Sequence, residues 1–189
     1  MTSSSDPHEP TRSPVFRLAL AVVLVLLLLA SAGTLVWLVA DRRGEADEIQ
    51  AEREAVMAQT EQFMLRLGTF GPDLLDEQGG MPDYRARIKE VITPNFATSF
   101  DKEAVTAEQL VAQGQVSRDA EVFATGVAVI DADSATALVA GSFTDTYPQG
   151  KDGERLPAQP VPFRIEVSLV KTGGEWLVDD FTPVTGGPQ

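Results

Sequence analysis

The pattern of hydrophobic and polar positions divides the chain into three stretches of different character. Residues 1–17 are rich in Ser, Pro and Thr and almost free of apolar side chains, which predicts a disordered tail. Leu18 to Ala40 follow without a single charge. A helix of about 23 residues is about 34 Å long, enough to cross a hydrocarbon core of about 30 Å. The pattern therefore predicts a transmembrane helix at residues 18–40.

A cleaved signal peptide is the alternative interpretation of this apolar stretch. Arg12 and Arg17 would precede its apolar region, and Ala30, Ser31 and Ala32 fit a small-residue cleavage site. The apolar run continues for eight residues past Ala32, however, which favours an uncleaved anchor. The arginines on the two sides of the stretch are nearly balanced, so the positive-inside rule leaves the orientation open.

Beyond the apolar stretch, apolar residues recur at three-, four- and seven-residue steps, the spacing of amphipathic helices. The first helix is expected at Glu45 to Leu67. Its first turns are polar on all sides, which predicts a juxtamembrane helical stalk at residues 41–55 and a folded domain at residues 56–184. Three further helical segments are expected, at Pro72 to Gln78, at Asp83 to Ile92 and at Asn95 to Gln113.

From residue 121 the period of the pattern changes from about 3.6 to 2, which predicts strands. Four strands are expected, at Glu121 to Ile130, Ala135 to Tyr147, Val161 to Lys171 and Glu175 to Val184, with a polar loop at Pro148 to Pro160 and a frayed end at residues 185–189. In the last strand, Trp176 and Val178 are expected on one face, and Leu177 and Phe181 on the other. Helices followed by hairpin-connected strands predict an α+β domain, with short helices on one face of a four-stranded antiparallel sheet.

Small residues line one face of each of the first two predicted strands. They are Ala124, Gly126 and Ala128 on the first strand, and Ala135, Ala137 and Gly141 on the second. Such residues leave room for helices to approach the sheet closely, or for an apolar cavity that would suit a lipid or sterol. Close packing of protein interiors favours the first interpretation.

Composition excludes most classes of enzyme. The chain contains no Cys, which rules out disulfides, thiol catalysis and Cys-ligated metals. The single histidine, His8, lies in the predicted tail, so no imidazole is available beside a nucleophile in the domain. The formal net charge of −13 would repel nucleic acid.

Three groups of polar side chains could carry chemistry, and each has a structural explanation that we favour. Asp179 and Asp180 are adjacent carboxylates, but neighbouring strand residues point to opposite faces and cannot share a proton. Tyr84 and Tyr147 could help an Asp to stabilise an enolate, or could pack with their hydroxyls at the surface. Asp131 and Asp133 could bind calcium, but two carboxylates fall short of a full oxygen shell and are typical of turns.

Trp176 could stack on a ligand, although a tryptophan in a strand more often belongs to the core. We therefore predict no catalytic residue, no cofactor-binding residue, no cofactor and no metal ligand.

The order of these parts, and four stretches of sequence, resemble the Mce-associated membrane proteins of actinobacteria. The stretches are QFMLRLGTFGPDLL (62–75), MPDYRARIKEVITPNFATSF (81–100), VFATGVAVIDADSATALVAG (122–141) and PFRIEVSLVKTGGEWLVDDF (162–181). The resemblance covers about residues 50–184. It implies a nuclear-transport-factor-2-like (NTF2-like, or cystatin-like) cone, a cytoplasmic N-terminus and an extracytoplasmic domain, and it supplies no functional residue.

The leading hypothesis is a non-enzymatic, single-pass protein of the cell membrane that supports a mammalian-cell-entry (Mce) type lipid import complex. Its expected partners are the lipid bilayer, the importer subunits and a lipid ligand, and not nucleic acid. A SnoaL-like or ketosteroid-isomerase-like enzyme with the same fold is the first alternative. An assembly factor of a type IV secretion channel is the second.

Overall fold

The computed structural model describes residues 27, 28, 30, 31, 34, 47–149 and 154–184. The chain divides into two compact units, Met1–Ile49 and Gln50–Gln189, and the second unit holds all the named helices and strands. The predicted tail (1–17), most of the predicted transmembrane segment (18–40), the first part of the stalk and the predicted frayed end (185–189) lie outside the described residues. Within the part that is described, no helix combines the length and the apolar character that a membrane span requires.

The helices agree closely with the sequence pattern. Residues 47–68 are helical, and a short 3-10 helix, η1 (Pro72–Leu74), follows. Helices α2 (Pro82–Lys89) and α3 (Pro94–Gly114) each begin with a proline, which suits the first helical position because its N–H would be unpaired there in any case. Thr93 caps α3 by accepting a hydrogen bond from the backbone N–H of Phe96, at 3.1 Å.

The sheet has five antiparallel strands, one more than predicted. They are β1 (Ser117–Ile130), β2 (Ser134–Gln149), β3 (Glu154–Pro157), β4 (Val161–Thr172) and β5 (Glu175–Pro183). Four of them run in the order β1-β2-β4-β5, and β3 pairs with the far end of β2. The extra strand, β3, lies inside the predicted loop. Its four residues, ERLP, are all exposed and show no alternation, so no period could reveal it.

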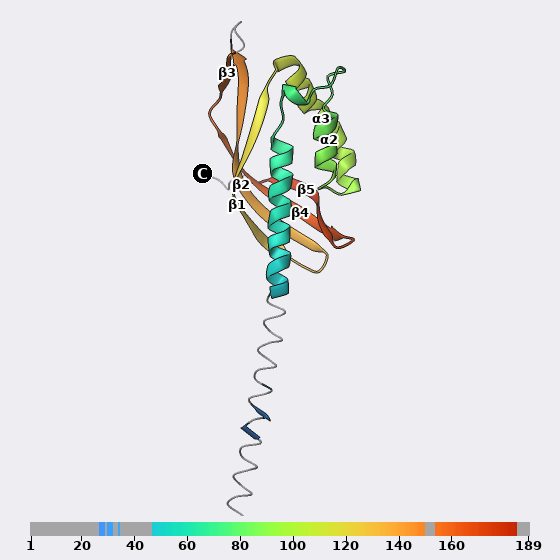
Figure 1. Cartoon of the computed structure of the whole chain (residues 1–189), viewed down its shortest axis with the longest axis vertical. Helices are drawn as coiled ribbons and strands as arrows, with labels where there is room; N and C mark the ends of the chain where they lie inside the picture. The colour runs from blue at the N-terminus through green and yellow to red at the C-terminus, as the bar shows by residue number, and fades with distance from the viewer. Residues whose placement is uncertain (1–26, 29, 32–33, 35–46, 150–153, 185–189) are drawn as a thin grey trace, which may run out of the picture. The chain divides into compact units, whose positions relative to one another are not determined.

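Helices cover one face of the sheet (Figure 1), and the core lies between the two layers. Its fully buried members come from both layers and include Phe63, Met64, Ile88, Phe100, Val167, Leu169 and Val178. The structure thus confirms the predicted α+β class and the antiparallel sheet with helices on one face. Residues 52 and 53, which the sequence pattern assigned to the stalk, already contact the sheet.

Phe181 lies on the same face as Trp176 and Val178, so the predicted alternation in the last strand is wrong. The pairing of β4 with β5 contains a bulge in which Asp179 is an extra residue. One extra residue reverses the alternation of side chains beyond it. The ring of Phe181 consequently faces the helices, where its centroid lies 5.6 Å from that of Phe63.

The two rows of small residues lie on opposite faces of the sheet. Ala135 and Ala137 of β2 are buried in the core, as expected for a close approach of the helices. Ala124, Gly126 and Ala128 of β1 are exposed instead, and line a shallow groove of about 440 Å³ on the other face. The interpretation that small residues let the helices approach the sheet closely therefore holds for β2 only.

Candidate functional site

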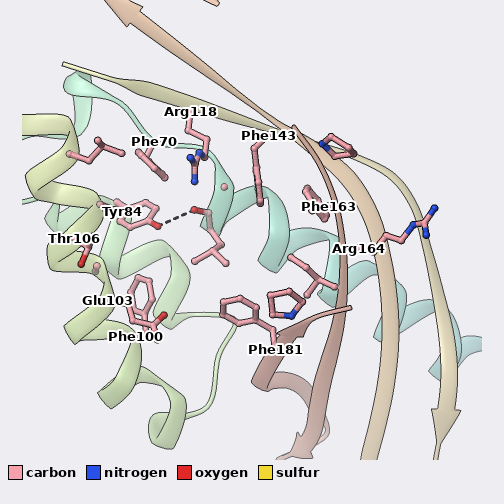
Figure 2. Close-up of a pocket in the computed structure, with 18 of the residues that line it drawn as sticks. Phe70, Tyr84, Phe100, Glu103, Thr106, Arg118, Phe143, Phe163, Arg164 and Phe181 are labelled. Carbon is pink, nitrogen blue, oxygen red and sulfur yellow. Dashed lines mark hydrogen bonds between the residues drawn. The ribbon is translucent and has the colours of Figure 1, made fainter. Parts of the chain in front are cut away.

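A cavity of about 600 Å³ opens between α3 and the ends of β4 and β5. Seven elements contribute to its lining, from the end of the helix at residues 47–68 to the last residues of β5. The lining is mainly apolar and contains six aromatic rings, those of Phe70, Tyr84, Phe100, Phe143, Phe163 and Phe181 (Figure 2). This size and this lining are typical of small-molecule sites, which measure about 300–1,000 Å³.

Close packing at Gly68 sets the position of one wall. A Cβ atom at Gly68 would lie 2.5 Å from Cε1 of Phe143, so only glycine lets the helix end against this ring. Phe143 in turn stacks on Phe163, with 4.5 Å between the ring centroids. The two rings form a continuous apolar surface across β2 and β4.

Tyr84 is buried in the lining, with only 2% of its surface exposed. Its hydroxyl donates a hydrogen bond to the backbone carbonyl of Leu67 at 3.0 Å (Figure 2). Burial raises the pKa of Tyr84 to about 12, because the charged phenolate is poorly solvated there. Tyr84 is therefore a neutral donor that already has its partner, and not a proton acceptor.

Arg118 supplies a cation to the lining, and Asp145 neutralises it. The guanidinium donates from Nε to Oδ1 at 2.6 Å and from Nη2 to Oδ2 at 2.9 Å. The carbon at its centre also lies 5.6 Å from the ring of Phe70 and 5.2 Å from the ring of Phe143. Hydrogen bonding to Arg118 holds the pKa of Asp145 below its usual value, so both groups are charged and cancel.

A second ion pair joins helices α2 and α3 beside the cavity. Arg85 of α2 donates from Nε and Nη2 to the two carboxylate oxygens of Glu108 on α3, at 2.7 and 2.6 Å. The same carboxylate accepts the backbone N–H of Met81 at 3.0 Å. Hydrogen bonding to Arg85 lowers the pKa of Glu108, which is only 8% exposed. The pair fixes the spacing of α2 and α3.

The rim of the cavity is mixed in character. On α3 it consists of the exposed residues Glu103, Thr106 and Leu110. Arg164 belongs to the lining, but its side chain points away from the cavity (Figure 2). Among the described lining residues, no carboxylate is hydrogen-bonded to the Tyr84 hydroxyl, whose partner is the carbonyl of Leu67. The mainly apolar lining is suited to binding an apolar group.

The structure separates the two tyrosines that the sequence singled out. Tyr84 lines the cavity but bonds to a backbone carbonyl, and Tyr147 is exposed, with its hydroxyl 3.5 Å from Oδ2 of Asp145. Neither faces a buried carboxylate across the cavity, which is the geometry that the isomerase-like alternative requires.

Asp179 and Asp180 have separate partners. Asp179 accepts a hydrogen bond from the hydroxyl of Thr93 at 2.6 Å, whereas the exposed Asp180 accepts the backbone N–H of Phe181 at 2.8 Å. Asp131 and Asp133 lie in the turn between β1 and β2, and their backbone groups bond to Ser134 and Lys171. Asp131 and Asp133 thus belong to the turn through their backbone groups, and Asp179 links β5 to the start of α3.

Trp176 belongs to the core, which agrees with the structural explanation. It is 5% exposed, and its indole N–H donates to Glu52 at 2.8 Å. The residues that the sequence did not single out are Arg118, Asp145, Phe143 and Phe163. Arg118, a lone arginine at the start of an apolar strand, was the one available signal of this ion pair. The strand register that brings Asp145 opposite Arg118 cannot be read from the sequence.

Comparisons with known proteins find sequence relatives in Mycobacterium tuberculosis. The uncharacterized protein Rv1362c of Mycobacterium tuberculosis is 30% identical over 169 residues, a match that covers 86% of this chain and 70% of that protein. No family model matches the chain.

Two solved structures have a similar fold. An IcmL-like type IV secretion system protein from Legionella pneumophila has a TM-score of 0.50 at 12% identity, over 72% of this chain and 96% of that chain. A periplasmic fragment of TraM has a TM-score of 0.50 at 6% identity, over 70% of this chain and 97% of that chain. These neighbours share an NTF2-like fold with this chain, as the resemblance implied, and at such identities they show the fold alone.

Proposed function

Since the chain belongs to the same family as the mycobacterial protein Rv1362c, we propose that it is a non-enzymatic accessory subunit of a multiprotein membrane complex. The observation that carries this proposal is the similarity in fold to the IcmL-like secretion system protein and the periplasmic TraM fragment. Each of them is matched over nearly its whole length. An accessory subunit acts by binding its partners, and the apolar cavity is in keeping with such a role.

We propose that residues 18–40 anchor the chain in the cell membrane as one transmembrane helix, with the N-terminus in the cytoplasm. The uncharged stretch has the length of a membrane span, and the predicted stalk and domain follow it in the sequence. Because the chain has no cysteine, single cysteines can report the topology without background. In intact cells, a membrane-impermeant maleimide should label Gln149→Cys but not Ser4→Cys. Labelling of Ser4→Cys alone would show that the chain has the opposite orientation. Release of the chain into the medium would show that residues 18–40 do not anchor it.

Two kinds of complex fit this role. The solved neighbours favour a secretion or conjugation channel, in which the chain would act as an assembly factor. The sequence resemblance favours an Mce-type lipid importer, and the apolar cavity is in keeping with lipid as its cargo. Both kinds of complex assign the same accessory role to the domain. Identifying the subunits that purify with the chain would distinguish a secretion channel from a lipid importer.

Affinity purification of the tagged full chain from native membranes tests the proposal. A single-pass protein with an unrelated domain, carrying the same tag, is the control for non-specific recovery. We expect the subunits of one transport or secretion complex to be enriched with this chain only. Recovery of this chain without any specific companion, from membranes in which such a complex is intact, would contradict the accessory role.

A further inference from the structure

The cavity leaves apolar side chains uncovered that a closed core would bury. Leu67, Phe143, Phe163 and Phe181 pack against the core on one side and are only partly buried. All four contribute to the wall of the 600 Å³ space. Burying apolar surface is favourable by about 25 cal/mol per Å², so covering these side chains would favour the binding of an apolar ligand in the cavity.

The walls are held in place by contacts that do not depend on an occupant. The hydroxyl of Tyr84 is bonded to Leu67, and the carboxylate of Glu108 is bonded to Arg85. The side chain of Phe143 is held between Gly68 and Phe163. A preformed site of this kind binds its ligand with little loss of conformational entropy.

The charges around the cavity select against an anionic ligand. Asp145 already neutralises Arg118, and Arg164 points away from the cavity. Glu103 adds a carboxylate at the rim, and the chain as a whole carries a net charge of −13. A carboxylate or phosphate monoester would therefore meet repulsion without an unpaired cation to bind it.

We propose that this cavity binds a single hydrocarbon chain of a lipid that has no net charge. The aromatic lining contacts the chain, and the rim between α3 and β4 leaves the polar head in water. One apolar side chain of a partner protein is too small to fill a space of this size, whereas small-molecule ligands occupy cavities of about 300–1,000 Å³. The inference goes beyond the accessory role and does not depend on it, because the cavity belongs to this chain alone.

Photolabelling in vesicles tests the proposal with the full chain and no partner subunit. The probe is phosphatidylcholine with a diazirine in one acyl chain, mixed into phosphatidylcholine vesicles that contain the protein. After illumination, we expect labelled peptides from α3 and β4, in addition to any from residues 18–40. Vesicles with a diazirine-bearing free fatty acid should label α3 and β4 more weakly, because its carboxylate is charged.

Two matched variants show whether the label reports the cavity. Ala107→Phe places a ring in the cavity and should abolish labelling of α3 and β4, whereas Ala124→Phe on the opposite face should leave it unchanged. Circular dichroism checks that both variants are folded. If Ala107→Phe is not folded, Leu110→Asp at the exposed rim replaces it and should give the same loss.

Three results would overturn the proposal. The first is labelling of the domain that persists in the folded cavity variant, and the second is stronger labelling by the anionic fatty acid than by phosphatidylcholine. The third comes from photo-crosslinking in cells with benzoylphenylalanine in place of Leu110. A crosslink to a polypeptide and not to a lipid would show that a partner protein occupies the cavity. Because the vesicles contain no other protein, failure of the accessory role would leave the vesicle result intact.

Discussion

Arg118 of β1 lies directly opposite Asp145 of β2, and the two side chains form a two-pronged ion pair at the inner wall of the cavity. The donor–acceptor distances are 2.6 and 2.9 Å, and the guanidinium packs against two phenylalanine rings. A cation in an aromatic cavity would attract anionic ligands if it were free. Its pairing is the reason why we expect an uncharged ligand.

Removing the carboxylate should reverse this selectivity. In Asp145→Asn the guanidinium of Arg118 keeps its charge and loses its partner, so the cavity gains an unpaired cation. The diazirine-bearing fatty acid should then label α3 and β4 more strongly than phosphatidylcholine does. The variant should also be less stable by about 1.5–3 kcal/mol, the usual contribution of a hydrogen bond to a charged group, as measured by chemical unfolding.

Asp119→Asn is the matched control, because this neighbouring acid is exposed and pairs with Thr144 across the strands. It removes the same charge from the chain without changing the cavity. Equal gains in fatty-acid labelling for both variants would mean that the net charge of the chain sets the selectivity, and that the Arg118–Asp145 pair does not.

The ion pair between α2 and α3 should contribute to stability. Glu108→Gln keeps the shape of the side chain but leaves Arg85 with a weaker acceptor, which should cost about 1–3 kcal/mol in the free energy of unfolding. Glu103→Gln, on the exposed side of the same helix, should change it by less than about 0.5 kcal/mol. Chemical denaturation of the three proteins checks this. Similar values for both variants would show that the Arg85–Glu108 pair stabilises nothing.

Acid should destabilise the domain. Arg118 and Arg85 hold the pKa values of Asp145 and Glu108 below 3.8 and 4.5, so the unfolded chain binds more protons than the folded protein as the pH falls. The stability that these two ion pairs contribute is fully present above the pKa values of the two carboxyls in the unfolded chain. It is lost as the pH falls through their lower pKa values in the folded protein. We expect a constant melting temperature from about pH 7 to about pH 5 and a decrease below about pH 4. In Asp145→Asn the melting temperature should decrease less at acid pH than in the unchanged protein. An equal decrease would show that protonation of Asp145 does not cause the acid destabilisation.

The buried phenol of Tyr84 gives an independent measure of cavity geometry. The chain contains two tyrosines, so a Tyr147→Phe variant has Tyr84 as its only phenol. Ultraviolet titration of this variant should show tyrosinate forming with a midpoint near 12, because burial raises the pKa of Tyr84 to about 12. A midpoint near the ordinary value of 10 would mean that the hydroxyl is in contact with water and that this wall is open.

The sequence predicted most helices and strands because their apolar positions repeat with a clear period. Helix α3 and strand β4 were placed within one residue of their observed bounds. The prediction failed where tertiary contacts act against the local pattern. β3 exists only because it pairs with the end of β2, and the extra residue Asp179 turned Phe181 to the face opposite the one expected.

The cavity itself could not be read from the sequence. Its rings come from segments as far apart as Phe70 and Phe181, and only the folded register brings them together. The sequence offered only two rows of small residues as an indication of a cavity, and the row on β1 lines a shallow groove on the other face. The absence of cysteine constrains the chemistry whatever the fold, because it excludes disulfides and thiolate ligands directly from composition.

Native mass spectrometry of the full chain released from its own membranes tests the central claim most directly, because it weighs the chain together with whatever it holds. We expect an assembly that dissociates into this chain and other membrane polypeptides. A single, bare chain, obtained under conditions that keep a known membrane complex from the same cells intact, would contradict it.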